Sequence, residues 1–237
     1  MSVLEIKNVT KSFGDLRAVD DVSFSLEQGD NLAIIGESGC GKTTLAKMIM
    51  GLTKPDAGFI WAEAYSVQMV FQDPNLSLDP LWNVQGILKE GLWQRRYLPD
   101  QEIQAKIEKM LVAVGLPLEI LQRFPHEFSG GERQRIAIAR ALLASPKVLV
   151  LDEAVSALDT LVQKQIIDLL KKLKQDFNLT YIFISHNLRL VRNFSDKIVV
   201  MYQGKIVEEG LVKTVLQSPA HPYTQQLLQA AFYTHLK

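Results

Sequence analysis

The residues best suited to binding phosphate lie together in one glycine-containing stretch, residues 36–44 (GESGCGKTT). This stretch follows an apolar run and precedes a predicted helix. It fits the pattern G-x-x-x-x-G-K-[ST] through Gly36, Gly41, Lys42 and Thr43. Glycines let successive N–H groups face one anion at the positive end of the helix. Lys42 would reach the terminal phosphates of a nucleotide, and the Thr43 hydroxyl would hold Mg²⁺. The alternative, an ordinary strand, turn and helix with chance glycines, is disfavoured by this context.

Two adjacent carboxylates, Asp152 and Glu153, follow a second apolar run at residues 148–151. A continuous apolar run is typical of a parallel strand that is covered on both faces. Ligands of open α/β sheets bind where such strands end. One carboxylate could hold the Mg²⁺ shell while its neighbour polarises an attacking water. A solvated acidic turn is the alternative, and the buried strand before it favours a functional role.

Three further residues occupy positions where a ligand could be met, and each has a structural alternative. Gln72 stands at the exit of the predicted strand 66–71, where a ligand oxygen is useful, although a loop glutamine more often has no role. His186 follows the apolar run 181–184 and could bind a terminal phosphate, although a single histidine is more often structural. Phe13 lies in a predicted turn and could stack on a base or belong to the core.

A second candidate anion site is the sequence FSGGE at residues 128–132, directly before an Arg- and Ala-rich helix. Ser129 and Glu132 have the spacing of a capping box, and Gly130 and Gly131 leave the first amides of the helix uncovered. Taken alone, such a sequence is more often merely a well-made helix start, and the structural alternative is favoured over an anion site.

The elements that position these residues are predicted to form one integrated domain, because no internal repeat or long linker interrupts them. Strands are expected at 3–9, 22–26, 32–35, 59–61, 66–71, 148–151, 181–184, 198–202 and 205–208. Helices are expected from near residue 42, within about 83–145, along 162–177 and from 225 to about 232.

The composition excludes several other classes of protein. Lys+Arg and Asp+Glu both total 26, so no global field draws the chain to nucleic acid. Cys40 is the only cysteine, which leaves no disulfide framework and no cysteine-based metal site. No apolar run approaches the ~18 residues of a membrane span, and the N-terminus lacks the apolar core of a signal peptide. We expect a chain without a transmembrane segment of its own.

In this order, the motifs resemble those of the ATP-binding subunit of an ABC transporter over essentially the whole chain. The matching positions are Phe13 (adenine-stacking aromatic), residues 36–44 (Walker A), Gln72 (Q-loop), residues 128–132 (signature), 148–153 (Walker B), 156–159 (D-loop) and His186 (switch histidine). Within this family, the chain resembles most the oligopeptide, dipeptide and nickel permease branch. This narrower resemblance is carried by residues 70–80, 127–142 and 218–228. We interpret the tail motif His221-Pro222-Tyr223 as a lineage marker without chemistry of its own.

The resemblance implies a fold and a function. The fold is α/β: a RecA-like P-loop NTPase core, a small antiparallel β subdomain and an inserted α-helical subdomain at about 74–145. All of these form one domain over 1–237, with a permease-type tail at about 218–237.

The function that the resemblance implies is ATP hydrolysis that energises an importer of di- or oligopeptides or nickel, at the cytoplasmic face of the cell membrane. The implied partners are a second ABC ATPase subunit, head to tail, two transmembrane permease subunits and, indirectly, an external solute-binding protein, with no nucleic acid. A soluble non-transport ABC-type ATPase and a degenerate ATP-binding regulatory subunit are the alternatives.

The resemblance also implies roles for individual residues. The nucleotide-binding residues are Phe13, Gly36, Glu37, Ser38, Gly39, Cys40, Gly41, Lys42, Thr43, Thr44, Gln72, Ser129, Gly130 and Gly131. The Mg²⁺ ligands are Thr43, Gln72 and Asp152. Glu153 would position or deprotonate the water, and His186 would stabilise charge on the transferring phosphoryl group. Ser129, Gly130 and Gly131 would act in the partner's site, so that hydrolysis depends on dimer closure.

The chain departs from the family pattern at four places. Glu132 stands where Gln is usual, Asn187 replaces Asp, and residues 154–155 replace Pro-Thr. The segment 59–68 is also shorter than in related subunits. None of the substitutions removes a catalytic group, whereas the shortened segment could weaken nucleotide binding or signal an altered partner.

Overall fold

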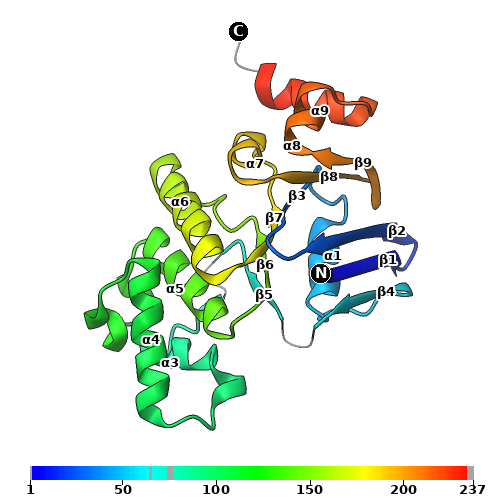
Figure 1. The fold of residues 1–237 in the computed structure, drawn as a ribbon. Coiled ribbons are helices and arrows are strands. Elements are labelled where there is room, and N and C mark those ends of the chain that lie inside the picture. Colours follow the sequence, from blue (N-terminus) through cyan, green and yellow to red (C-terminus); the bar gives the residue numbers. More distant parts are fainter. Residues whose placement is uncertain (1, 64–65, 74–76, 234–237) are drawn as a thin grey trace.

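The computed structural model describes residues 2–63, 66–73 and 77–233, and it contains two sheets and a group of helices (Figure 1). Pro74, at which the sequence places the start of the helical region, and residues 234–237 of the tail lie outside the described residues. Among the described helices, none is long and apolar enough to span a bilayer.

The larger sheet is built around fully buried parallel strands. Its spatial order is β5 (Val67–Val70), β6 (Val148–Asp152), β7 (Thr180–Ile184), β3 (Asn31–Ile35), β8 (Lys197–Tyr202) and β9 (Lys205–Leu211). The first five strands are parallel, and β9 pairs antiparallel with β8. Every residue of β3, β6 and β7 is buried, as their continuous apolar sequences require.

The smaller sheet is antiparallel, in the order β2 (Leu16–Glu27), β1 (Ser2–Phe13) and β4 (Ala57–Ala62). β1 and β2 are longer than the sequence predicts, because their pairing continues past the apolar alternation into a polar ribbon that ends at Phe13 and Leu16. Phe13, which was expected in a turn, is therefore the last residue of β1.

Helices complete the two faces of the larger sheet. The α-helices are α1 (Lys42–Ile49), α3 (Val84–Glu90), α4 (Asp100–Val114), α5 (Gly130–Leu143), α6 (Thr160–Phe177), α7 (Leu188–Phe194), α8 (Val212–Gln217) and α9 (Pro222–Tyr233). Short 3₁₀ helices lie at η1 (Trp93–Arg95), η2 (Leu118–Gln122) and η3 (Pro125–Glu127). The predicted fold class is confirmed: a parallel core, a small antiparallel sheet, and helices inserted between β5 and β6.

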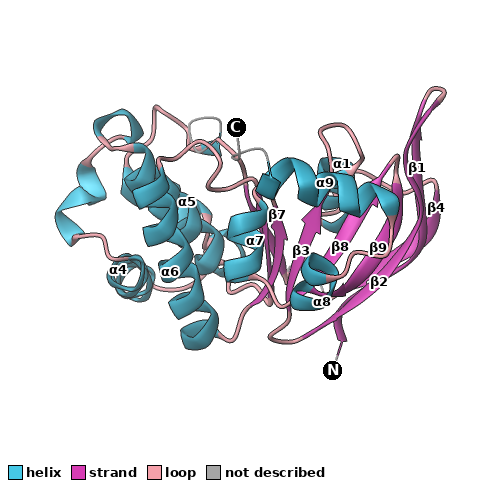
Figure 2. Cartoon of the chain, turned by 90° about the horizontal axis from the view of Figure 1, so that it is seen from above, coloured by secondary structure: helices cyan, strands magenta, loops and turns pink. Residues whose placement is uncertain are grey.

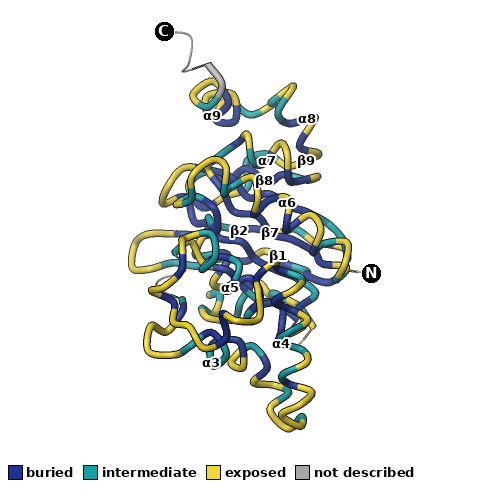
Figure 3. The backbone as a smooth tube through the Cα atoms, turned by 90° about the vertical axis from the view of Figure 1, so that its left-hand side faces the viewer, coloured by how far each residue is buried: buried dark blue, intermediate teal, exposed yellow. Residues whose placement is uncertain are grey.

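Alternate residues of the parallel strands face two separate cores, as the period-2 geometry of a strand dictates. On β3, Leu32 and Ile34 join the core shared with α1 and the antiparallel sheet, whereas Ala33 and Ile35 join the core shared with the helical region. Figure 2 shows the result, with α4, α5 and α6 on one side of the parallel strands and β1, β2 and β4 on the other. The buried residues run through the strands in the middle of the molecule (Figure 3). The carboxyl ends of these strands are thus held between two packed layers.

Two elements near the end of the chain differ from the prediction. The sequence pattern did not indicate α7, a short helix whose start is capped by Asn187: its side chain accepts from the N–H groups of Arg189 and Leu190 at 3.1 and 3.3 Å. Helix α9 begins at Pro222, earlier than the expected residue 225, because proline suits the first position of a helix.

Candidate functional site

The phosphate loop, residues 36–41, lies between buried strand β3 and helix α1, and its backbone passes very close to two other strands. A Cβ added at Gly36 would collide with the carbonyl oxygen of Met201 on β8, and one at Gly41 with that of Ala18 on β2. The φ angles of Gly36 and Gly41 are 150° and 108°, in the region that favours glycine. Glycine is therefore required at both positions by space as well as by conformation.

Lys42 begins α1, and its side chain folds back over the phosphate loop. The residue is 6% exposed, and its Nζ donates to the carbonyl oxygens of Gly36 and Glu37, both at 2.8 Å. The Sγ of Cys40 lies 3.6 Å from the same nitrogen. Within the described residues, Lys42 forms no ion pair. A buried ammonium with no carboxylate of the described residues within ion-pair distance is well placed for an anion, because burying a charge unpaired is costly.

The start of α1 supplies backbone donors beside this ammonium. Gly41 precedes the helix, and no side chain of the described residues caps its first turn. The first amides of a helix lack intrahelical partners and are commonly satisfied by an anion. Thr43, in this first turn, is exposed, and Thr44 is half-buried. Ser38 and Gly39, at the top of the loop, are exposed as well. The donor set therefore fits a polyphosphate.

Asp152 ends β6 and lies next to Thr43. It is 7% exposed, and burial raises the pKa of its carboxyl above the ordinary value, an effect that a hydrogen bond with the Thr43 hydroxyl opposes and the Glu153 carboxylate reinforces. Within the described residues, no group of three or more His, Cys, Asp or Glu could hold a metal on its own. A hydroxyl and one carboxylate suit Mg²⁺, which usually takes its remaining ligands from water and substrate phosphates.

Glu153 follows Asp152 in a left-handed backbone conformation, with φ of 49°. Its N–H donates to the carbonyl oxygen of Ile184, the last residue of β7, at 3.0 Å. Its Oε1 lies 3.4 Å from Nδ1 of His186, which follows β7. A non-glycine residue in this region is uncommon and is often found at functional sites. The structure thus brings Glu153 and His186 together at one edge of the sheet.

Gln72 and Phe13 are both exposed. Gln72 follows β5, and β5 pairs with β6 through Val70 and Leu151, so Gln72 stands beside the strand that ends in Asp152. Phe13 is 53% exposed at the end of β1, with Lys11 Nζ 5.6 Å from its ring centroid. About half of the residue is exposed, so the ring is accessible to a planar ligand.

The signature residues 129–131 are not brought to the phosphate loop. Ser129 caps α5, and the carboxylate of Glu132 accepts from the Ser129 N–H at 2.9 Å and from its hydroxyl at 2.7 Å. A Cβ at Gly131 would collide with Val162 on α6, so the glycine permits this close approach. Figures 1 and 2 show α5 and α1 on opposite sides of the parallel strands. Within one chain, the start of α5 and the start of α1 therefore do not form one site.

One contact of the phosphate loop was not expected from the sequence. The backbone N–H of Glu37 donates to the hydroxyl of Tyr223, on α9, at 2.9 Å. The tail motif carried a recognisable pattern, but no local spacing could place it against residues so distant in the chain.

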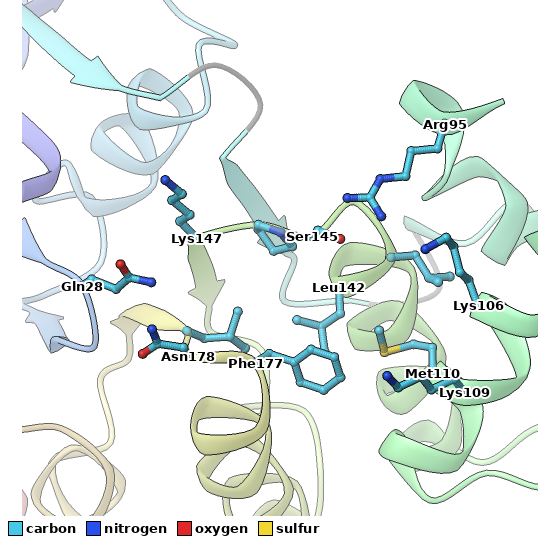
Figure 4. A pocket seen from close by; sticks show the side chains of 13 residues that line it. Gln28, Arg95, Lys106, Lys109, Met110, Leu142, Ser145, Lys147, Phe177 and Asn178 are labelled. Atoms are coloured by element: carbon cyan, nitrogen blue, oxygen red, sulfur yellow. The ribbon is translucent and has the colours of Figure 1, made fainter. Parts of the chain in front are cut away.

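A cavity of about 360 Å³ lies elsewhere, between the helical region and the sheet (Figure 4). Its lining includes Lys147 and Leu179, which directly precede β6 and β7, together with Arg95, Lys106 and Lys109. It therefore lies at the amino ends of the parallel strands, away from the phosphate loop.

Comparisons with known proteins agree with this geometry. The family described as "ABC transporter" matches residues 19–156. The chain is 43% identical over 256 aligned positions to the oligopeptide transport ATP-binding protein AppF of Bacillus subtilis (strain 168), covering 97% of this chain and 78% of that protein. It is 47% identical to the probable D,D-dipeptide transport ATP-binding protein DdpF of Escherichia coli (strain K12), covering 93% and 72%. The alignment with AppF exceeds the 237 residues of this chain, so AppF has residues in the matched span that this chain lacks.

A solved structure extends the likeness to three dimensions. The structure of cbiO1 from Clostridium perfringens, part of the ABC transporter complex cbiONQ, superposes with a TM-score of 0.83 at 27% identity. The match covers 92% of this chain and 91% of that one.

Proposed function

The chain belongs to the ABC transporter family, and from this premise we propose that it binds Mg·ATP at the phosphate loop and energises the import of peptides. The predicted resemblance to ATP-binding subunits of ABC transporters is confirmed, and ATP hydrolysis follows from membership. What we propose is the assignment of the site residues, the partners and the substrate class.

The buried ammonium of Lys42 is the observation that carries the assignment of the site. It is held by two loop carbonyls at the start of α1, beside uncapped amides. Residues 36–44 would hold the phosphates, and Phe13 would stack on the adenine. Thr43, Gln72 and Asp152 would hold Mg²⁺, which when bound neutralises charge on the phosphates.

Glu153 would orient the attacking water and accept its proton. The bond from its N–H to Ile184 fixes its backbone, and its carboxylate is only partly exposed, which favours one orientation. His186 would donate a hydrogen bond to the transferring phosphoryl group. Positioning and charge neutralisation of this kind supply most of the catalysis of phosphoryl transfer.

A second ATPase subunit would complete the site. Ser129, Gly130 and Gly131 lie at the start of α5, which is on the opposite side of the parallel strands from α1 (Figures 1 and 2). In a head-to-tail dimer they could therefore cap the nucleotide held by the partner. Hydrolysis would then require closure of the dimer, and reopening would drive two transmembrane permease subunits between conformations. On this proposal the chain would act at the cytoplasmic face of the membrane.

The names of the relatives favour peptides over nickel as the transported substrate. The two relatives described above are named for oligopeptide and D,D-dipeptide transport. Since an ATPase subunit does not contact the transported substrate, the peptide assignment rests on the similarity to these relatives.

Two experiments test the proposal. The first measures nucleotide binding and hydrolysis: the purified chain should bind and hydrolyse Mg·ATP, and a Lys42→Ala variant should lose binding. Lys54→Ala, at an exposed lysine, is the control and should bind ATP as the wild type does. Hydrolysis absent from the chain alone and from its complex with the permease subunits would favour a regulatory role.

The substrate class requires an uptake assay. Deleting the gene in its host should abolish uptake of a labelled tripeptide and leave ⁶³Ni²⁺ uptake intact. Wild-type protein should restore peptide uptake, and Lys42→Ala should not. Loss of nickel uptake with intact peptide uptake would contradict the peptide assignment.

A further inference from the structure

We propose that Tyr223 is a positioning residue for the phosphate loop, through which the C-terminal helix sets the affinity of the site for nucleotide. This inference rests on the ATP-binding function proposed above. It gives the tail motif His221-Pro222-Tyr223 a role in place of the lineage marker that the sequence indicated.

The Tyr223 hydroxyl forms a hydrogen bond with the same peptide group that binds the Lys42 ammonium. The N–H of Glu37 donates to the Tyr223 hydroxyl at 2.9 Å. This N–H belongs to the same peptide group as the carbonyl of Gly36, which accepts from Lys42 Nζ at 2.8 Å. One peptide group is therefore held at both ends, and two hydrogen bonds in such a chain strengthen one another. Its orientation, and with it the position of the Lys42 ammonium, depends on Tyr223.

Tyr223 is itself held firmly. The residue is 7% exposed, and its ring packs on that of Tyr202 with centroids 4.2 Å apart and planes at 32°. Tyr202 ends β8, directly after Met201, whose carbonyl oxygen lies against Gly36. The aromatic pair thus rests on the strand that also supports the phosphate loop.

The other two residues of the motif and a glutamate anchor the start of α9. The Nδ1 of His221 accepts from the Tyr223 N–H at 3.2 Å, and Pro222 occupies the first helical position. The Glu208 carboxylate, on β9, accepts from the N–H groups of Ala220 at 2.8 Å and His221 at 3.1 Å. These contacts fix where α9 begins, so the Tyr223 hydroxyl has little freedom to leave the loop.

The test is Tyr223→Phe, which removes the hydroxyl and keeps the ring. We expect the Kd for Mg·ATP and the KM of hydrolysis to rise about 3- to 10-fold, the usual effect of losing one such hydrogen bond. The kcat should fall by a smaller factor. One control, Tyr97→Phe at an exposed tyrosine, should leave Kd and KM unchanged.

A double-mutant cycle tests the route through the tail. Glu208→Ala should also weaken ATP binding, and it should do so less in the Tyr223→Phe background, because coupled residues are not additive. Equal Kd and KM in Tyr223→Phe and wild type, with equal thermal stability, would overturn the inference. So would tighter binding, or full additivity with Glu208→Ala. Failure of wild-type protein itself to bind ATP would instead remove the proposed function.

Discussion

The Nδ1 of His186 lies 3.4 Å from the Oε1 of Glu153, although the two residues belong to different strand ends. Parallel pairing of Asp152 with Ile184 brings the ends of β6 and β7 level. The Glu153 side chain is 21% exposed and that of His186 is 65% exposed. The carboxylate is therefore enclosed and oriented, while the imidazole stands at the surface where a second subunit and a nucleotide could meet it.

Replacing Glu153 by Gln keeps the shape of the side chain and removes its ability to take a proton. We expect hydrolysis to fall by about 100-fold or more, since general-base catalysis contributes about 10²- to 10⁴-fold. ATP should remain bound, because the phosphate-binding groups are untouched. Phosphate release and nucleotide retained through gel filtration measure the two effects, with Glu119→Gln as the surface control. A kcat within about threefold of wild type would remove Glu153 from the role of base.

Replacing His186 by Ala tests a different step, the stabilisation of charge in the transition state. We expect kcat to fall by about 10²-fold with little change in KM, as for the loss of one preorganised donor. Thermal stability should change little, because the side chain is 65% exposed. A rise in KM at constant kcat would show that His186 serves ground-state binding instead.

The local parts of the site were predictable because each is encoded in a short stretch. The phosphate loop combines a buried strand, glycines and a helix start, and the Asp152-Glu153 pair follows an apolar run that is typical of a covered strand. Both patterns are complete within a few residues. The fold class followed from the family resemblance that the order of the motifs carries.

The features that could not be predicted from the sequence depend on contacts between distant segments. The Glu37–Tyr223 bond joins residues 186 positions apart, and neither has a local pattern that names its partner. β1 is longer than predicted because polar residues continue its pairing with β2, and a pattern of alternating apolar residues does not reveal such pairing. Helix α7 is a single short element whose only signal was a capping residue, Asn187.

Two glycines of the phosphate loop should respond differently to alanine. A Cβ at Gly39 would meet nothing within 4 Å, whereas one at Gly41 would collide with the Ala18 carbonyl. Both have positive φ, at 83° and 108°. Gly39→Ala should cost about 1–2 kcal/mol of stability from backbone strain alone. Gly41→Ala should cost clearly more and abolish ATP binding. Denaturant unfolding and ATP titration measure the difference, and equal losses would contradict the steric argument.

The capping box of α5 should make stability depend on pH. Hydrogen bonds from the Ser129 hydroxyl and N–H lower the pKa of Glu132 below its ordinary value. A carboxyl whose pKa is lower in the folded state contributes stability above its unfolded pKa and loses it as the pH falls through the folded pKa.

Glu132→Gln keeps a side chain able to complete the capping box and removes its charge. It should therefore lower the Tm at pH 7 by about 1–3 °C, since an acidic residue in the first turn contributes about 0.3–1 kcal/mol. The difference from wild type should shrink as the pH falls below about 4, where the free carboxyl is protonated. Thermal unfolding of both proteins between pH 3 and pH 7 measures this, with Glu119→Gln as the control for an exposed carboxylate. A difference that stays constant across the range would mean that Glu132 stabilises α5 through packing and not through its charge.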